Sequence, residues 1–360
     1  MGEMVHPKQI ESELSRLWKT LQRTGKMRAC LFNFIIYSKQ WQRVEYLDKI
    51  ARNVIQKFPS RIIFITYDDT CTNPALQTAV SVMTAEENSN DIACDMIEIK
   101  ACDRNHPRVP FVILPHLLPD LPVYLLHASD PAKESPIDQK LEFFANRMIF
   151  DSREATDLPS YARAVLERQA RTRADIADLN WARTEGWRQL IASVFKSNTE
   201  LHRLRSARKI TIYFNRKRSK LPDHTHTQAV YLQAWIAAQL GWTLNTVTKG
   251  CFSYQLERHF THIHLIPKKI DSVPSGQVLS LEIQTDSDFC YKMERNYHCP
   301  QNVTIEKSST HFCAIPFHFF FNQDSSRQSL VKEICHRGTS LHYTNTLRTL
   351  ATIKKGCSFQ

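Results

Sequence analysis

Apolar and polar positions alternate along the first half of the chain in a pattern typical of strands separated by helices. Five short apolar runs predict strands, at 29–37, 61–66, 91–100, 121–126 and 147–150. Amphipathic segments between and after them predict helices at 39–57, 109–118, 136–146 and 158–175. Strands that alternate with helices predict a three-layer α/β domain with a largely parallel sheet over residues 1–175.

The pattern changes over residues 176–360. A helix is predicted at 178–204, a strand at 209–214 and a second helix at 225–240. Short β-rich runs with turn signals between them follow, at 242–247, 252–256, 261–266, 278–283, 289–293, 303–307 and 312–317. Two helices, near 326–336 and 341–354, complete the pattern. This half is predicted to be an α+β domain with an antiparallel meander.

Composition excludes several classes of protein. With 360 residues, of which 42% are hydrophobic, the chain has enough apolar surface for two folded domains and is not a disordered chain. It has 8 glycines and neither of the glycine-rich motifs of common nucleotide sites, so we expect no cofactor. The apolar stretch 110–128 contains four prolines and no export signal is evident, so a cytoplasmic protein without membrane contact is expected.

Cysteine and histidine patterns give no convincing metal site. The ten cysteines are scattered without a C-x-x-C motif, and reduced thiols are expected. Histidines cluster at His224 and His226 and again at His259, His262 and His264. Alternate histidines on a strand could share a metal, but nothing fixes a third ligand, and Cys290, His298 and Cys299 have poorer spacing. We therefore favour a structural or surface role and expect no bound metal.

Charge is distributed unevenly. Residues 1–175 carry 23 basic and 23 acidic side chains, whereas residues 176–360 carry 24 basic and 13 acidic ones, so the net charge of +11 lies in the second half. Basic residues crowd both ends of the predicted strand 209–214: Arg203, Arg205, Arg208, Lys209, Arg216, Lys217, Arg218 and Lys220. They form either a solvated face or a surface for an anionic partner. Nucleic acid is disfavoured, since no RNP, zinc-finger or helix-turn-helix signature is present.

A polar segment, Asp151, Ser152, Arg153 and Glu154, follows the predicted strand 147–150. Ligands of open α/β sheets bind at the carboxyl ends of strands, which favours a polar site there. The alternative is a helix start capped by Ser152. No partner base for a nucleophile is evident, so no catalytic residue is assigned.

The segment 178–195 is the most unusual. Its apolar stripe, at helical spacing, includes Arg183, and a guanidinium that faces a core needs an acceptor. An acidic partner from the first half is predicted, with Asp151, Glu154 and Asp120 as candidates. Three residues on the opposite side have seven-residue spacing and form either a partner-binding face or a packed surface: Trp181, Arg188 and Phe195.

Five sequence strings extend the interpretation. They are Leu31-Phe-Asn-Phe-Ile-Ile-Tyr-Ser38, Phe58-Pro-Ser-Arg-Ile-Ile-Phe-Ile65, Leu118-Pro-Asp-Leu-Pro-Val123, Ile149-Phe-Asp-Ser-Arg153 and Asp178-Leu-Asn-Trp-Ala-Arg183 with Trp187-Arg188. In this order they resemble the glucose-6-phosphate dehydrogenase assembly protein (OpcA) family, strongly over residues 28–200. The residues that carry the resemblance include Asp120, Pro122, Asp151, Ser152, Arg153, Asp178, Asn180 and Arg183.

The resemblance implies a protein that is not an enzyme. Family members bind glucose-6-phosphate dehydrogenase, promote its active oligomer and raise its activity, as allosteric activators in the oxidative pentose phosphate pathway and NADPH supply. On this hypothesis the basic second half, with Trp181 and Arg188 if exposed, docks on an acidic patch of the dehydrogenase. The alternatives are a sugar-phosphate-handling α/β enzyme with a site at Asp151, Ser152 and Arg153, and a nucleic-acid-binding protein.

The predicted acidic partner of Arg183 can be tested by an Arg183→Met substitution. Loss of the guanidinium would leave a buried carboxylate unpaired, so the variant is expected to unfold at a lower temperature than the wild type. Thermal unfolding measures the difference. A well-packed variant of undiminished stability would mean that no such partner exists.

Overall fold

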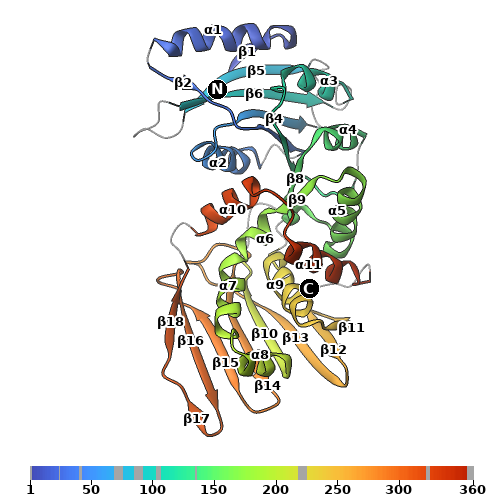
Figure 1. The fold of residues 1–360 in the computed structure, drawn as a ribbon, viewed down its shortest axis with the longest axis vertical. Coiled ribbons are helices and arrows are strands. Elements are labelled where there is room, and N and C mark those ends of the chain that lie inside the picture. Colours follow the sequence, from blue (N-terminus) through green and yellow to red (C-terminus); the bar gives the residue numbers. More distant parts are fainter. Residues whose placement is uncertain are drawn as a thin grey trace. The chain divides into compact units, whose positions relative to one another are not determined.

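The computed structural model describes residues 2–23, 25–39, 43–68, 76–84, 92–102, 107–133, 136–217, 225–321 and 325–354. The chain forms two compact units, each built from more than one stretch of sequence (Figure 1). Unit 1 comprises Met1–Asp151, Arg168–Ala177 and Ile334–Gly338, and unit 2 comprises Ser152–Glu167, Asp178–Glu333 and Thr339–Gln360. Two units agree with the expected pair of domains, whereas the boundary at residue 175 stays a prediction.

A mixed sheet forms the centre of unit 1. Within the described residues it has nine strands, in the order β1-β5-β6-β4-β3-β7-β8-β9 with β2 paired to β6. The strands are β1 (Glu3–Val5), β2 (Met27–Arg28), β3 (Asn33–Ser38), β4 (Arg61–Asp68), β5 (Gln77–Thr84), β6 (Ile92–Cys102), β7 (Val123–Ala128), β8 (Arg147–Phe150) and β9 (Asp175–Asp178). The pairings β6-β4, β4-β3, β3-β7 and β7-β8 are parallel, and β5 and β1 add an antiparallel edge.

Helix α2 (Val44–Ile55) shows how the pattern specifies this unit. It connects the parallel strands β3 and β4 and lies inside the predicted helix 39–57. Its buried residues follow the 3.6-residue period: Leu47, Ile50, Ala51, Val54 and Ile55. The other helices that begin in unit 1 are α1 (Ile10–Gln22), α3 (Val109–Ile113) and α4 (Pro136–Phe144).

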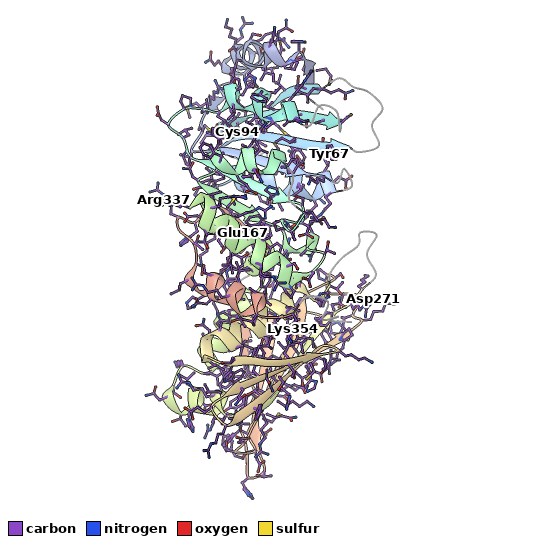
Figure 2. The ribbon with its side chains drawn as sticks, turned by 90° about the vertical axis from the view of Figure 1, so that its right-hand side faces the viewer. Tyr67, Cys94, Glu167, Asp271, Arg337 and Lys354 are labelled. Carbon is purple, nitrogen blue, oxygen red and sulfur yellow. The ribbon has the colours of Figure 1, made fainter. Side chains whose placement is uncertain are left out.

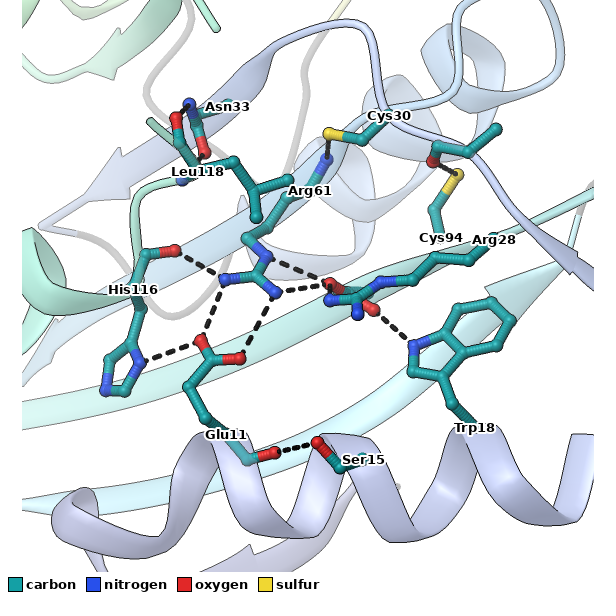
Figure 3. A network of polar contacts seen from close by, with 12 residues as sticks. Glu11, Ser15, Trp18, Arg28, Cys30, Asn33, Arg61, Cys94, His116 and Leu118 are labelled. Atoms are coloured by element: carbon teal, nitrogen blue, oxygen red, sulfur yellow. Dashed lines mark hydrogen bonds and ion pairs between the residues drawn. The ribbon is translucent and has the colours of Figure 1, made fainter. Parts of the chain in front are cut away.

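A polar network joins α1 to the sheet (Figure 3). The Arg61 side chain, at the start of β4, is buried and forms ion pairs with Asp95 on β6 (2.7 Å) and Glu11 on α1 (2.8 Å). It also donates a hydrogen bond to the carbonyl oxygen of His116 (2.7 Å). The indole of Trp18 donates to Asp95 (2.6 Å). The buried guanidinium is therefore satisfied by acceptors from three segments of the chain.

The network predicts a pH dependence of stability. The hydrogen bond with His116 and the charge of Arg61 lower the pKa of Glu11 from 4.5 to about 2, against the opposing effect of burial. A carboxyl group with a lowered folded-state pKa stabilises the fold above its unfolded pKa and loses that contribution as the pH falls. The unfolding temperature of Glu11→Gln should therefore fall less steeply than that of the wild type as the pH decreases from about 4.5 to about 2.

The matched control for this experiment is Glu45→Gln, at an exposed position of α2. Circular dichroism at each pH measures the unfolding temperature. If Glu11→Gln and Glu45→Gln follow the wild-type curve equally well, the network does not titrate in this range.

Unit 2 contains the second sheet. Its nine strands within the described residues follow the order β11-β12-β13-β10-β14-β15-β16-β17, with β18 paired to β16. The strands are β10 (Ala207–Asn215), β11 (Thr243–Thr248), β12 (Cys251–Leu256), β13 (His259–Lys268), β14 (Val278–Thr285), β15 (Cys290–Arg295), β16 (Asn302–Ser309), β17 (Phe312–Cys313) and β18 (Phe317–Phe320). The β10–β13 pairing is parallel and the others are antiparallel, so the predicted meander forms most of this sheet.

The predicted helix 178–204 is wrong as one continuous element. The structure divides it into α6 (Leu179–Arg183), α7 (Glu185–Val194) and α8 (Asn198–Arg205). Ser197 caps α8, because its hydroxyl accepts a hydrogen bond from the Glu200 amide, and this starts a new helix where the periodicity suggested continuity. The remaining helices are α5 (Leu158–Thr172), α9 (Thr227–Leu240), α10 (Ser325–Cys335) and α11 (Leu341–Ala351).

Two further expectations concern cysteines and membranes. Cys102 takes part in a disulfide bond, so the expectation of reduced thiols is wrong for this residue. The scattered spacing of the ten cysteines gave no signal for this bond. The described residues include no helix of the length and hydropathy that a membrane span requires.

Candidate functional site

Asp151, the predicted polar residue after β8, is fully buried in unit 1 and forms an ion pair with Arg43 (2.5 Å). Arg43 directly precedes α2, and its guanidinium lies over the ring of Tyr46, 5.0 Å from the centroid. A buried ion pair of this kind holds two chain segments in register and strongly penalises loss of either partner. The carboxyl end of β8 therefore carries a structural ion pair.

This ion pair lies at the edge of the sheet where ligands of open α/β proteins bind. From β3 the chain runs through α2 to β4, which lies beside β3 in the sheet. On the other side of β3 lies β7, from which the chain runs through α4 to β8. The strand order therefore reverses between β3 and β7. Dinucleotides bind at such a switch point on a glycine-rich turn after the first strand. Here residues 39–43 read Lys-Gln-Trp-Gln-Arg, without glycine. The residues present therefore do not fit a dinucleotide in the usual manner.

Sequence reasoning missed a second buried group at this edge. His127, on β7, has its Nδ1 atom 3.1 Å from the hydroxyl of Ser129 and its Nε2 atom 3.7 Å from a carboxylate oxygen of Glu142. Glu142 also accepts hydrogen bonds from Arg168 (2.6 Å) and Arg171 (2.7 Å). A serine, a histidine and a carboxylate are the components of a nucleophile and base set, but all three side chains are buried. The apolar strand pattern around His127 gave no signal for it.

Ser152 belongs to a different cluster, centred on Asp178 in unit 2. The Asp178 carboxylate is fully buried and accepts five hydrogen bonds from described residues. Two come from Ser152, through its amide (3.0 Å) and its hydroxyl (3.0 Å), and one from the hydroxyl of Tyr161 (2.7 Å). Two more come from the amides of Asn180 (2.7 Å) and Trp181 (2.8 Å), which makes Asp178 the N-cap of α6.

The side chains around this carboxylate extend the cluster. Asn180 donates to the Ser152 hydroxyl (3.0 Å), and Arg183 donates to the carbonyl of the Asn180 side chain (2.7 Å). Tyr161, Tyr231 and Tyr343 are fully buried, and burial raises their pKa values well above the usual value. Asp178, Ser152, Asn180 and Arg183 are thus brought together by hydrogen bonds, whereas an acidic partner of Arg183 from the first half stays a prediction.

The other predicted residues lie elsewhere. Arg153 donates to the carbonyl oxygen of Ser275 within unit 2 (3.3 Å). Asp120 is exposed and adopts a left-handed backbone conformation (φ 62°) in the turn before β7. The carbonyl oxygen of Pro122 accepts the Asn33 amide (2.8 Å). Asp120 and Pro122 therefore lie at the amino ends of parallel strands, opposite the end that carries Asp151.

The possible partner-binding face at Trp181 and Phe195 is buried. Trp181 packs against Tyr231 and Tyr343, and Phe195 against Tyr291. Arg188 lies over the Trp181 ring, 3.5 Å from its centroid, and donates to the Trp181 carbonyl oxygen (2.6 Å). Burial lowers the pKa of Arg188 to about 10. The break at Thr184 separates these residues between helices, so their spacing does not create an exposed stripe.

Basic residues occur at both ends of β10 but do not form one patch. Nine extended residues span about 27 Å, which separates the group at Arg203, Arg205, Arg208 and Lys209 from the group at Arg216 and Lys217. Arg203 pairs with Glu200 (2.5 Å), Arg208 with Asp286, and Lys217 with Asp271 (3.7 Å). Arg205, Lys209 and Arg216 are exposed and form no ion pair with the part of the chain that the structure describes. Arg218, Lys220 and His224 lie outside the described residues.

The described histidines and cysteines form no group of three or more potential metal ligands. His262 and His264 alternate along β13, and the His264 Nε2 atom is 3.8 Å from the Cys251 sulfur. Burial is the main cause of a lowered His264 pKa, with contributions from the charges of Lys209 and His262. His262, His264 and Cys251 lie on one face of the sheet.

Two family models match the chain in succession. The model described as the glucose-6-phosphate dehydrogenase subunit N-terminal domain matches residues 51–168, and the corresponding C-terminal domain model matches residues 174–317. The chain belongs to the OpcA family. The resemblance seen in five sequence strings is thus confirmed, and it extends further into the second half than those strings do.

Relatives carry the same family name. A Synechocystis protein named OxPP cycle protein OpcA is 27% identical over 201 residues, which cover 54% of this chain and 40% of that protein. A Nostoc punctiforme protein of the same name is 24% identical over 216 residues, covering 59% of this chain and 44% of that protein. The chain therefore spans less than half the length of these OpcA relatives.

Solved structures share the architecture of this OpcA chain. The open conformation of KijD10, a 3-ketoreductase from Actinomadura kijaniata, superposes with a TM-score of 0.51 at 8% identity, covering 89% of this chain and 94% of that one. A point mutant of the same reductase also gives a TM-score of 0.51, at 9% identity. At this identity the likeness extends to the fold alone.

The Asp178 cluster predicts a strong effect of one substitution in this OpcA chain. Asp178→Asn replaces an acceptor oxygen by an NH₂ group that faces donors, and it removes the charge from the hydrogen bonds that remain. We expect a loss of about 3 kcal/mol or more in the free energy of unfolding, measured by urea denaturation.

Asp271→Asn is the matched control, because the Asp271 side chain is 78% exposed at the surface of unit 2 (Figure 2). It should change stability by less than about 1 kcal/mol. Equal effects of the two substitutions would contradict a special role for Asp178.

Proposed function

We propose that this OpcA chain is a non-catalytic assembly factor that binds glucose-6-phosphate dehydrogenase and promotes its active oligomer. By raising dehydrogenase activity it would act as an allosteric activator in the oxidative pentose phosphate pathway and support NADPH supply. The observation that carries the proposal is the match to both dehydrogenase subunit domain models, one after the other, across residues 51–168 and 174–317. The cytoplasm is the compartment in which this partner would be met.

The sheet edge of unit 1 supports a role without catalysis. Arg43 and Asp151 neutralise each other at the position where a related architecture would bind a dinucleotide, and the sequence of residues 39–43 contains no glycine. An activator requires only that it bind one state of its partner more tightly than another. Typical coupling free energies are about 1–3 kcal/mol, which one protein surface can supply.

We propose that docking uses the basic group at the start of β10. Arg205 and Lys209 are exposed without an ion pair to the described residues, so their charges are available to an acidic surface. Arg203 and Arg208 are partly neutralised by Glu200 and Asp286. Trp181 and Phe195 are buried, so they are not part of this proposed surface.

The proposal is tested with the purified dehydrogenase of the same organism. Addition of this chain should raise dehydrogenase activity and shift the enzyme to a larger species in size-exclusion chromatography. Unchanged kinetic constants together with the absence of a complex would defeat the assignment.

Charge steering makes a second prediction. The association rate should fall as salt increases, and the double substitution Arg205→Glu and Lys209→Glu should lower it by about tenfold at low salt. Arg216→Glu, at the far end of β10, is the matched control and should have little effect. An association rate that is insensitive both to salt and to the double substitution would count against this docking face.

One observation keeps an enzyme as the second candidate. The Ser129, His127 and Glu142 arrangement could serve a sugar-phosphate-handling enzyme if the edge opened to a substrate. Under the assembly-factor proposal, the isolated chain turns over no sugar phosphate. Turnover that is abolished by Ser129→Ala and retained by Ser38→Ala, a buried serine at the end of β3, would replace the proposal by this alternative.

A further inference from the structure

One edge of the second sheet ends in an unusually apolar strand. β18 (Phe317–Phe320) pairs antiparallel with β16 through Asn302 to Ile305, and within the described residues no strand pairs with its other side. Figure 1 shows β18 as an outermost strand of its sheet. Its outer backbone amides and carbonyls are thus available to another strand.

The side chains along this edge are aromatic and uncharged. No Lys, Arg, Asp or Glu occurs from Ser308 to Phe321. The exposed fractions of Phe317 and Phe320 are 50% and 67%, and Ile315, in the loop before the strand, is 90% exposed. Edge strands of stable monomers are ordinarily protected by charge, proline or a bulge. Here Pro316 precedes the strand and leaves its four residues unprotected.

The strand is firmly anchored at its end. Phe321, the next residue, is buried, its ring packs on Trp187 with centroids 5.4 Å apart, and its amide donates to the Gln301 carbonyl oxygen (2.7 Å). Gly186 permits this approach, because a Cβ atom there would lie 2.9 Å from the Phe321 ring. The exposed edge is therefore a fixed, preorganised surface.

The opposite edge of the same sheet is different. β11 (Thr243–Thr248) presents threonines and an asparagine to solvent, and its pairing with β12 is interrupted by a bulge between Leu244 and Thr246. Bulges and polar residues protect an edge from further pairing. A head-to-tail contact between the two edges is disfavoured, which leaves pairing of like edges.

We propose that β18 is a dimerisation strand, which pairs antiparallel with β18 of a second copy of this chain about a two-fold axis. Alternation along the strand places Phe317 and Phe319 on the face of Val303 and Ile305, and His318 and Phe320 on the face of Thr304. In a two-fold pair, Phe317 and Phe319 of one copy then face the same phenylalanines of the other copy on one side of the sheet. On the other side, His318 and Phe320 of the two copies face one another.

The lack of charged residues along this edge favours a second copy of the chain as the partner. Electrostatic complementarity usually determines which foreign protein binds a surface, and this edge carries no charge with which to choose one. A two-fold contact instead requires that the surface match itself, which an uncharged aromatic strand does without like-charge repulsion. The basic residues proposed to dock the dehydrogenase, Arg205 and Lys209, lie outside this edge.

Sedimentation velocity of the purified full chain tests the proposal without the dehydrogenase. A four-residue pairing is small, so we expect a monomer–dimer equilibrium with a Kd on the order of 10 μM. Phe320→Lys should raise that Kd at least about tenfold, because two lysines would face each other or an aromatic ring across the two-fold axis. Amide exchange of 317–320 should also slow as protein concentration rises.

The matched control is Phe143→Lys, which makes the same change at a phenylalanine of α4 that is 82% exposed. It should leave the dimer unchanged, and both variants should keep the wild-type circular dichroism spectrum. A wild-type chain that stays monomeric at 200 μM (about twenty times the expected Kd), or a dimer indifferent to Phe320→Lys, overturns the proposal. Loss of dehydrogenase binding in Phe320→Lys with self-association intact also overturns it, in favour of a docking edge for the enzyme.

Discussion

A buried carboxylate cannot remain charged inside a protein unless donors surround it, and Asp178 meets that requirement through the backbone as well as through side chains. Its two oxygens accept from the amides that begin α6, from Ser152 and from Tyr161. One residue thus links the start of α6, the turn at Ser152 and Tyr161 on the part of α5 that belongs to unit 2. The resemblance strings that end in Arg153 and Arg183 meet at this carboxylate.

The spacing of apolar residues predicted the strands and helices that bury a regular apolar face. β3 is buried at every position and α2 has a regular buried stripe, and both were evident from apolar spacing. β1 and β2, of three and two residues, were missed because such short edges owe their structure to a neighbouring strand. The break at Thr184 was also missed, because the apolar stripe continues across it.

Site residues were harder to predict than elements, because the relevant partners are distant in sequence. Asp151 was identified correctly as a polar residue at a strand end, but its partner Arg43 lies 108 positions away. Neighbouring Ser152 was grouped with Asp151, yet it belongs to the Asp178 cluster of the other unit. The sequence pattern identified polar residues at strand ends, but it could not show which residues they contact.

The segment Ile334–Gly338 has a consequence for how the protein is made. It completes unit 1 late in the sequence, where the Gly338 amide donates to Asp175 (2.8 Å) and the Gly338 carbonyl oxygen accepts from Arg147 (3.0 Å). Domains generally fold as their residues leave the ribosome. Unit 1 must wait until residue 338 is synthesised, 163 positions after Asp175, before these hydrogen bonds form, so that part of the unit stays open to chaperones and proteases while the intervening chain is translated.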